Sequence, residues 1–392
     1  MSSIRSIAIY LPQFHPIPEN DAWWGKGFTE WTNVAKATPL FPGQYQPHLP
    51  ADLGFYDLRL EETRLAQEAL AKQYGIYGFC YYHYWFNGKR LLHEPLDRKL
   101  QNPKEDLPFM LCWANENWTR RWDGFDNEIL IKQNYSKEDD IEHIHFLCKQ
   151  YFSNPGYIRV NGKPFFTFYR VNLFPDIKQT IKIWREEARK LGIGELYIGY
   201  MTSFNQTYDL AEFDLDVAVE FAPHFHPPKQ KYGSPWRELV QQTTNYKREF
   251  LRRAGIKKLI LLNDQWEENN RKRSKSPFQK NTVFDYADLV EKRMRHKIAE
   301  RTYPSLYPMW DNTARKKGNN SLISINNTPA LYKKWLVSII QKFKPFSEEE
   351  NFIFINAWNE WAEGNHLEPC QKWGLQYLEA TRDALTEEEP NI

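Results

Sequence analysis

The segment that decides the fold lies near the C-terminus and reads FIFINAWNEWAEG from Phe352 to Gly364. Its first four residues are aromatic or β-branched without a polar interruption, which is typical of a buried strand. The amide, carboxylate and indole groups that follow indicate a loop at the carboxyl end of this strand. Because sites in α/β folds form at the carboxyl ends of strands, the segment predicts a functional tip.

Two carboxylates stand three residues apart in this tip, at Glu360 and Glu363. On one helical turn they would share a face, beside the indoles of Trp358 and Trp361. Like charges and apolar walls push apart the pKa values of two carboxyls, so one stays ionised while the other holds a proton. Cleavage of a glycosidic bond needs such a pair, and indole faces suit sugar rings. The alternative is a solvated helix start whose glutamates favour the helix dipole.

The same unit, an apolar run that ends in a polar and aromatic tip, recurs along the chain. The expected strands are 7–11, 76–82, 109–113, 165–169, 196–200, 215–219, 303–309 and 352–355. Apolar periodicity predicts helices over about 58–74, near 96, and over 137–152, 177–191 and 331–343. Alternating strands and helices in this number predict an α/β fold, a (β/α)8 TIM barrel whose strand tips all meet on one face.

The whole chain, 1–392, is expected to form this barrel as a single catalytic domain, which its length permits. A basic stretch over 229–301, which includes the run 271–273, separates strands six and seven and predicts an insert or subdomain. The apolar run 259–262 inside it is a ninth strand candidate, which we assign to the insert.

Composition narrows the class of protein. Hydrophobic residues make up 41% and charged residues 26% of the chain, which is typical of a globular protein. The formal net charge of +2 does not favour a nucleic-acid partner. No apolar stretch approaches the roughly 20 residues that span a bilayer, and the first strand is too short for a signal peptide. We therefore expect a cytoplasmic protein with buried free cysteines, and at most a transient contact of the basic insert with an anionic membrane surface.

If the barrel forms, its carboxyl face gathers polar and aromatic side chains around Glu360 and Glu363. The expected substrate-binding set comes from separate strand tips and consists of Tyr10, His15, Glu30, His83, Trp85, Asn115, Glu116, Trp118, Glu220, His224, Asp311, Asn359 and Trp361. Aromatic residues make up 16% of the chain, and so many rings must line a core or a cleft. We expect an oligo- or polysaccharide substrate and no cofactor.

Two other arrangements of these residues stay open. His224 and His226 have alternate spacing and with Glu220 could form a zinc set, although no third ligand has a compelling spacing, and we expect no metal. Glu116 also ends a strand beside an amide and could pair with Glu360 across the barrel. The separation of the two carboxyls would then decide the stereochemistry, at about 5 Å for retention and about 6.5–9.5 Å for inversion.

The basic run 271–273 could bind phosphate, but such a run is more often a solvated face. We therefore expect no nucleic acid. The chain has no P-loop and no glycine-rich dinucleotide fingerprint, so a nucleotide-dependent transfer lacks a recognisable site.

Several longer motifs carry a family resemblance. They are YLPQFH over 10–15, GFTEW over 27–31, GFCYYHYWF over 78–86, WANENW over 113–118 and NEWAEG over 359–364. In this order they resemble the WbsX-type proteins of bacterial polysaccharide gene clusters, over most of the chain. Those proteins are commonly labelled as glycosyltransferases of lipopolysaccharide or capsule biosynthesis.

The last motif also resembles the catalytic motif of the endo-α-mannosidases of glycoside hydrolase family 99, which are retaining (β/α)8 barrels that act through a 1,2-anhydrosugar. By position, the resemblance implies that Glu360 deprotonates the sugar's 2-hydroxyl. It implies that Glu363 protonates the leaving oxygen and later activates water. Asn359 and Trp361 match that motif as well, whereas Ala362 stands where the family often has His, so mannose is not implied as the substrate.

These observations predict an enzyme that cleaves or transfers a glycosidic bond in a bacterial surface polysaccharide, an O-antigen or a capsule. Two alternatives stay open. One is a sugar-nucleotide-dependent glycosyltransferase of lipopolysaccharide or O-antigen biosynthesis. The other is a glycan-binding protein without catalysis.

Overall fold

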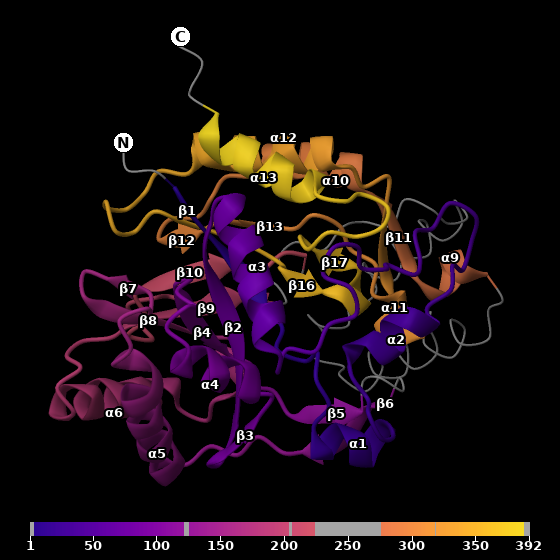
Figure 1. The fold of residues 1–392 in the computed structure, drawn as a ribbon. Coiled ribbons are helices and arrows are strands. Elements are labelled where there is room, and N and C mark those ends of the chain that lie inside the picture. Colours follow the sequence, from indigo (N-terminus) through magenta and orange to yellow (C-terminus); the bar gives the residue numbers. More distant parts are fainter. Residues whose placement is uncertain (1–3, 121–124, 204–205, 224–275, 318, 388–392) are drawn as a thin grey trace, which may run out of the picture.

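Apolar strands lie side by side around one core, and helices surround them (Figure 1). The computed structural model describes residues 4–120, 125–203, 206–223, 276–317 and 319–387. The barrel strands are β1 (Arg5–Tyr10), β2 (Ile76–Phe86), β4 (Phe109–Trp113), β8 (Lys163–Phe168), β9 (Tyr197–Thr202), β10 (Val217–Glu220), β12 (Thr302–Tyr303), β13 (Ser305–Leu306) and β15 (Phe352–Ile355). Their order in space is β12-β10-β9-β8-β4-β2-β1-β15-β13, and the paired neighbours are parallel. The predicted (β/α)8 barrel is therefore confirmed as a nearly closed barrel.

The strand expected over 303–309 is shorter and is divided by a proline. β12 pairs with β10, with Val219 opposite Tyr303, whereas β13 pairs with β15 on the other side. Pro304 separates the two pieces, and Pro308 follows soon after them. Because proline has no backbone N–H to donate to a neighbouring strand, it interrupts the ladder at both places. The two pieces together fill the seventh strand position and close the barrel.

Aromatic rings fill the barrel interior. The ring of Phe165 lies 5.8 Å from that of Phe352 and 5.9 Å from that of Tyr303, measured between centroids. Tyr303 and Phe352 are 5.5 Å apart, so rings from β8, β12 and β15 meet in the interior. Each fully buried ring removes apolar surface worth about 1.5–3 kcal/mol from water, which makes this cluster a main source of stability.

The helices predicted by periodicity form the outer layer, with small changes at their ends. They are α3 (Glu61–Gln73), α4 (Glu94–Gln101), α5 (Lys137–Leu147), α6 (Ile177–Lys190) and α12 (Pro329–Lys342). The stretch predicted as one helix over 137–152 continues after α5 as a π-helical turn, Cys148–Phe152. Side chains cap three of the starts: Ser136, Asp176 and Thr328 each accept a backbone N–H of the first turn.

Shorter elements surround the barrel, and two of them are short helices between β1 and α3. These two are α1 (Pro18–Trp24) and α2 (Glu30–Lys36), whose first turns carry acidic residues that suit a helix start. The other elements are β3 (Lys89–Leu91), β5 (Trp118–Arg120), β6 (Phe125–Ile131), β7 (Arg159–Val160), η3 (Val171–Leu173), α11 (Thr313–Lys316), β14 (Leu322–Ile325), β16 (Asn359–Glu360), η5 (Trp361–Glu363), β17 (Asn365–His366) and α13 (Gln376–Thr386).

Most of the expected insert, with its apolar run 259–262 and its basic run 271–273, lies outside the described residues. The part from residue 276 onward forms α9 (Pro277–Lys280), β11 (Thr282–Asp285) and α10 (Tyr286–Met294). β11 pairs in parallel with β14, and α10 packs beside α12, which in turn packs against α13 (Figure 1). The extent of the insert stays a prediction.

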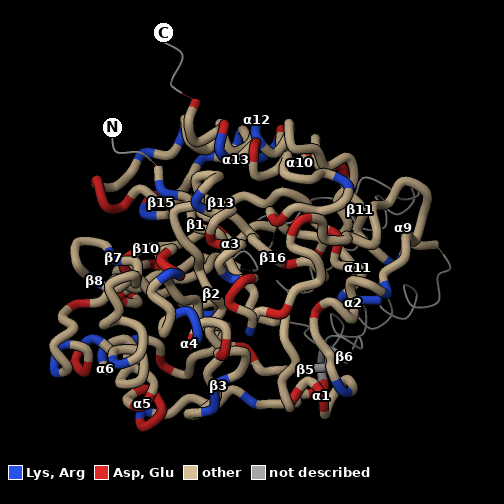
Figure 2. Tube along the Cα trace, in the orientation of Figure 1, with Lys and Arg blue, Asp and Glu red and all other residues tan. Residues whose placement is uncertain are grey.

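Charged residues of both signs lie on the outer helices α6 and α13, whereas α5 is mainly acidic and the charged residues of α12 are all lysines (Figure 2). No helix in the described ranges is long and apolar enough to cross a membrane. The four cysteines are free and buried, as the sequence predicted.

Candidate active site

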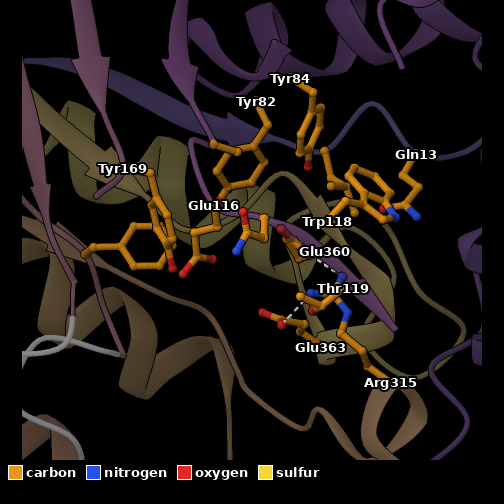
Figure 3. Close-up of a pocket in the computed structure, with 14 residues that line it drawn as sticks. Gln13, Tyr82, Tyr84, Glu116, Trp118, Thr119, Tyr169, Arg315, Glu360 and Glu363 are labelled. Atoms are coloured by element: carbon orange, nitrogen blue, oxygen red, sulfur yellow. Dashed lines mark hydrogen bonds and ion pairs between the residues drawn. The ribbon is translucent and has the colours of Figure 1, made fainter. Parts of the chain in front are cut away.

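The acidic motif follows β15 as a tight hairpin. β16 pairs antiparallel with β17, so that Asn359 lies opposite His366, and one 3-10 turn, η5, joins them. This turn ends at Gly364, which has a φ of +55°. Glycine adopts this left-handed conformation readily because it has no Cβ. The motif is therefore a strand end and a single turn rather than the start of a longer helix, and both glutamates still point to one place (Figure 3).

Hydrogen bonds fasten this hairpin to the end of β1. The side chain of Asn359 accepts a bond from the Leu11 backbone N–H at 2.7 Å and donates one to the Leu11 carbonyl at 3.0 Å. The backbone N–H of Trp358 donates to the Ile9 carbonyl at 2.8 Å. The first and last strands thus hold the motif between them.

A buried carboxyl, Glu368, supports the motif from behind. It accepts hydrogen bonds from Trp361 Nε1 at 2.7 Å, from the Tyr56 hydroxyl at 2.7 Å and from Gln67 Nε2 at 2.6 Å. The Trp361 ring also stacks on His366, with centroids 3.7 Å apart. Trp361 and Glu368 therefore fix the motif by contacts on its inner side. Burial raises the pKa of Glu368 to about 7.

A pocket opens in front of the motif and gathers side chains from most of the strand tips (Figure 3). The described lining residues are Leu11, Gln13, Tyr82, Tyr84, Ala114, Glu116, Asn117, Trp118, Thr119, Tyr169, Phe221, Arg315, Glu360 and Glu363. Rings and amides thus line one hollow together with three carboxylates, those of Glu116, Glu360 and Glu363, which is a composition typical of a ligand pocket.

One guanidinium joins the two motif glutamates to a third, buried glutamate outside the pocket lining. Arg315, on α11, contacts Glu30 at 2.7 Å, Glu360 at 2.9 Å and Glu363 at 2.5 Å. Burial raises the pKa of Glu360 to about 8, with Arg315 opposing the shift and the two other glutamates adding to it. Burial also raises the pKa of Glu30, against the pull of Arg315. The cluster therefore has more carboxylates than cations, and one of its acids readily holds a proton at neutral pH.

The other candidate acid, Glu116, lies apart from this cluster. It contacts Arg170 at 2.6 Å and lies beside Tyr82 and Tyr169 in the pocket (Figure 3). Glu363, rather than Glu116, shares a guanidinium with Glu360.

Several residues of the expected substrate-binding set lie behind the pocket wall. His83 Nε2 lies 2.8 Å from His143 Nε2, and Trp85 stacks on the same His143 ring and donates to Asp139. Both side chains face α5. In the same strand, Tyr82 and Tyr84 point into the pocket instead, because side chains alternate along a strand.

Other expected residues serve as supports. Tyr10 donates to Gln67, and Asn115 donates to the Arg170 carbonyl. Asp311 accepts from Gln44 and Thr313 next to α11. None of these three described side chains lines the pocket.

His15 and Glu220 are also buried away from the pocket. Burial lowers the pKa of His15 to about 4. Glu220 faces Arg293 at 3.7 Å and His296 at 3.3 Å, on a different side of the barrel wall. His224 and His226 lie outside the described residues. Within the described ranges, no group of three or more His, Cys, Asp or Glu could hold a metal ion.

Sequence reasoning missed Arg315 and the pocket-facing Tyr82, Tyr84 and Tyr169. The tyrosines lie in or next to strand tips that the sequence analysis had identified. The sequence did not show which alternate side chains of a strand face the pocket. Arg315 is four residues beyond Asp311, and only the position of α11 brings it to the acids of other tips.

Gly364 provides a first test of how the motif is held. A Cβ at this position would lie 3.0 Å from the backbone N and O of Asp311. Gly162 has a similar backbone, with φ of +76°, but open space around it. We expect Gly162→Ala to lower the free energy of unfolding by about 1–2 kcal/mol, from the left-handed backbone alone, and Gly364→Ala to lower it further. Urea unfolding measures the free energy of unfolding of both variants. Equal losses of stability in Gly162→Ala and Gly364→Ala would contradict the crowding at Gly364.

The pKa of Glu360 provides a second test. Its folded value of about 8 lies above the ordinary 4.5, so the folded state favours the protonated form and loses stability as the pH rises between these values. Glu360→Gln removes this loss. We expect the variant to melt progressively higher than wild type from pH 5 to pH 9, on the order of 1 °C for each kcal/mol in a chain of this size.

Glu379→Gln, on the exposed face of α13, is the matched control for this melting series. A difference between Glu360→Gln and wild type that stays constant over the whole pH range would contradict a raised pKa.

The family model described as Glycosyltransferase WbsX matches residues 6–381. The uncharacterized protein WxcX of two Xanthomonas campestris pv. campestris strains is 40% identical to this chain over 382 residues. That match covers 97% of this chain and 49% of the relative, so the chain spans about half the length of the curated relatives it matches.

Solved structures share the fold. A glycoside hydrolase family 99 endo-α-mannosidase from Bacteroides thetaiotaomicron, in complex with Bis-Tris propane, has a TM-score of 0.52 at 12% identity, over 97% of this chain and 96% of that chain. A glycoside hydrolase-like protein has a TM-score of 0.57 at 14% identity, over 99% of this chain and 95% of that chain. At such identities the likeness concerns the fold alone. Because the family model matches nearly the whole chain, the resemblance is confirmed, and this protein belongs to the WbsX family of carbohydrate-active proteins.

Proposed function

We propose that this protein cleaves or transfers a glycosidic bond, with Glu360 and Glu363 as the two proton-transferring residues. The observation that carries the proposal is that both carboxylates meet one guanidinium at the floor of a ring-lined pocket. Acetal cleavage needs an acid and a base held near one bond, and tyrosine and tryptophan rings supply faces for sugars.

In the proposed mechanism, Glu360 takes the proton of the sugar's 2-hydroxyl, which attacks the anomeric carbon and forms a 1,2-anhydrosugar. Its raised pKa makes the Glu360 carboxylate a stronger base, although a smaller fraction is ionised at neutral pH. Glu363 gives a proton to the leaving oxygen and then activates the water or acceptor that opens the anhydrosugar. The Glu363 side chain is 15% exposed and that of Glu360 6%, so Glu363 is the more accessible to a leaving group or water.

Glu116 and Trp118 also line the pocket and are proposed to bind the sugar directly. The motif is held in place by two of its own side chains, Asn359 and Trp361, and by Asp311 behind it. Of the remaining expected residues, His83, Trp85, Tyr10 and Asn115 would influence the sugar only through the wall residues that they support.

The charges of the pocket favour a glycosidic substrate over a sugar nucleotide. Among the described lining residues, the charged side chains are Glu116, Glu360, Glu363 and Arg315. Arg315 already contacts three carboxylates, and Arg170 is paired with Glu116, so both of these guanidiniums are engaged with carboxylates. A diphosphate would have to displace a carboxylate from its guanidinium, whereas an uncharged sugar would not. This argument favours a hydrolase or transglycosidase over a sugar-nucleotide-dependent transferase.

The family supports a proposal for the substrate class. Its description as a glycosyltransferase supports a glycan as the partner, and we propose a bacterial surface polysaccharide, an O-antigen or a capsule, handled in the cytoplasm.

Glutamine substitutions test the mechanism. We expect Glu360→Gln and Glu363→Gln each to lower turnover by about 10²–10⁴-fold, because each removes a proton transfer. The measurement is product release from fluorescently labelled O-antigen and capsule oligosaccharides, analysed by mass spectrometry. Full turnover by Glu363→Gln, together with a large loss in Glu116→Gln, would move the acid to Glu116.

A melting assay separates the proposal from the nucleotide-dependent alternative. We expect UDP- and GDP-sugars at millimolar concentration to leave the melting temperature unchanged, because Arg315 and Arg170 are already paired with carboxylates. A rise of several degrees would favour a sugar-nucleotide-dependent transferase. Tight glycan binding without any turnover, and with no loss in the glutamine variants, would favour a binding protein.

A further inference from the structure

We propose that Arg315 and Glu30 are positioning residues that hold Glu360 and Glu363 at one point and control the ionisation of Glu360. The proposal rests on the proposed function, since it gives the two motif glutamates their working geometry. It concerns residues on two other strand tips, which meet the motif only in the folded barrel.

The first support is the geometry of the guanidinium. Nη2 of Arg315 contacts both Glu30 and Glu360, and Nη1 contacts Glu363. A planar fork with separate N–H groups can hold several carboxylates in fixed directions, which a lysine ammonium cannot do. The two motif glutamates are therefore set relative to each other by the plane of one side chain.

The second support is the anchoring of Arg315 itself. Its helix, α11, begins at Thr313, whose hydroxyl donates to Asp311 at 2.7 Å. The backbone N–H of Asp311 in turn donates to the Glu363 carbonyl at 2.7 Å. Asp311 thus links the helix that carries the guanidinium to the backbone of Glu363, which fixes the position of one relative to the other.

The third support is the position of Glu30. Its side chain has no exposed surface and does not line the pocket, so it acts on the motif from behind, through Arg315 and the neighbouring Ala362 backbone. The next residue, Trp31, packs on Trp361 of the motif at 5.4 Å, which fixes α2 against η5. The Arg315 guanidinium stabilises the buried Glu30 carboxylate, and this carboxylate in turn fixes the guanidinium on the side away from the pocket.

The charged and titratable groups that face Glu360 come from four elements. They are Arg315 from α11, Glu363 from η5, Glu30 from α2, and the hydroxyls of Tyr82 and Tyr84 from β2. Among them Arg315 supplies the positive charge. Removal of Arg315 should therefore raise the pKa of Glu360, whereas removal of the Glu30 charge should lower it.

These opposite directions give the test, which is a titration of Glu360 by NMR of protein labelled with ¹³C at the glutamate carboxyl. The signal is assigned by its loss in Glu360→Gln. We expect the pKa to rise by about 1 or more in Arg315→Gln, to fall in Glu30→Gln, and to change less in Arg315→Lys, which keeps the charge. Arg185→Gln removes an ion-paired arginine of the outer helix α6 and serves as the control without effect.

The proposal is overturned if Arg315→Gln titrates like wild type, or if Arg315→Gln and Glu30→Gln shift the pKa in the same direction. Circular dichroism verifies that each variant folds. If Arg315→Gln does not fold, the titrations of Arg315→Lys and Glu30→Gln still decide the test. The titration needs no substrate, so it is separate from the proposed function. On a glycan that wild type cleaves, the acidic limb of the pH profile should move with the pKa, and Arg315→Lys should lose turnover because its ammonium lacks the fork.

Discussion

The parallel pairing of the first and last barrel strands is the contact on which the site depends. β1 and β15 run side by side, with Ile7 opposite Phe354, and their pairing places both strand ends at the same edge. The bonds from Asn359 to the Leu11 backbone continue this pairing into the loops. Because the two strands are almost 350 residues apart, the site forms only when the barrel closes.

Closing the barrel also concentrates charge in a buried place. Glu30, Glu360 and Glu363 come from two strand tips, and each would be costly to bury as an isolated anion. The single Arg315 guanidinium compensates them in part, while burial, and then the two neighbouring carboxylates, raise the pKa of Glu360. In the proposed mechanism, the burial that disfavours the ionised cluster would also strengthen Glu360 as a base, so the site would exchange stability for chemistry.

Part of this could be predicted from the sequence. Local apolar runs identified the strands, and the tip after β15 identified Glu360 and Glu363. The sequence could not show which face of β2 lines the pocket. Tyr82 and Tyr84 face the pocket, whereas His83 and Trp85 face α5. Alternation defines two faces of a strand, but the packing of α5 decides which of them is turned outward. For the same reason Asn115 and Asp311, at genuine strand tips, became supports rather than lining residues.

The sequence alone determined the eight strand positions along the chain, the motif with its two acids and the family, because these depend on neighbours along the chain. The tertiary structure decided that Arg315 joins acids from different tips, that Glu30 lies beneath it, and that Pro304 divides the seventh strand between two partners. Ion pairs between distant segments depend on where helices and turns settle against the closed barrel. No local pattern encodes that placement, since it results from packing across the whole core.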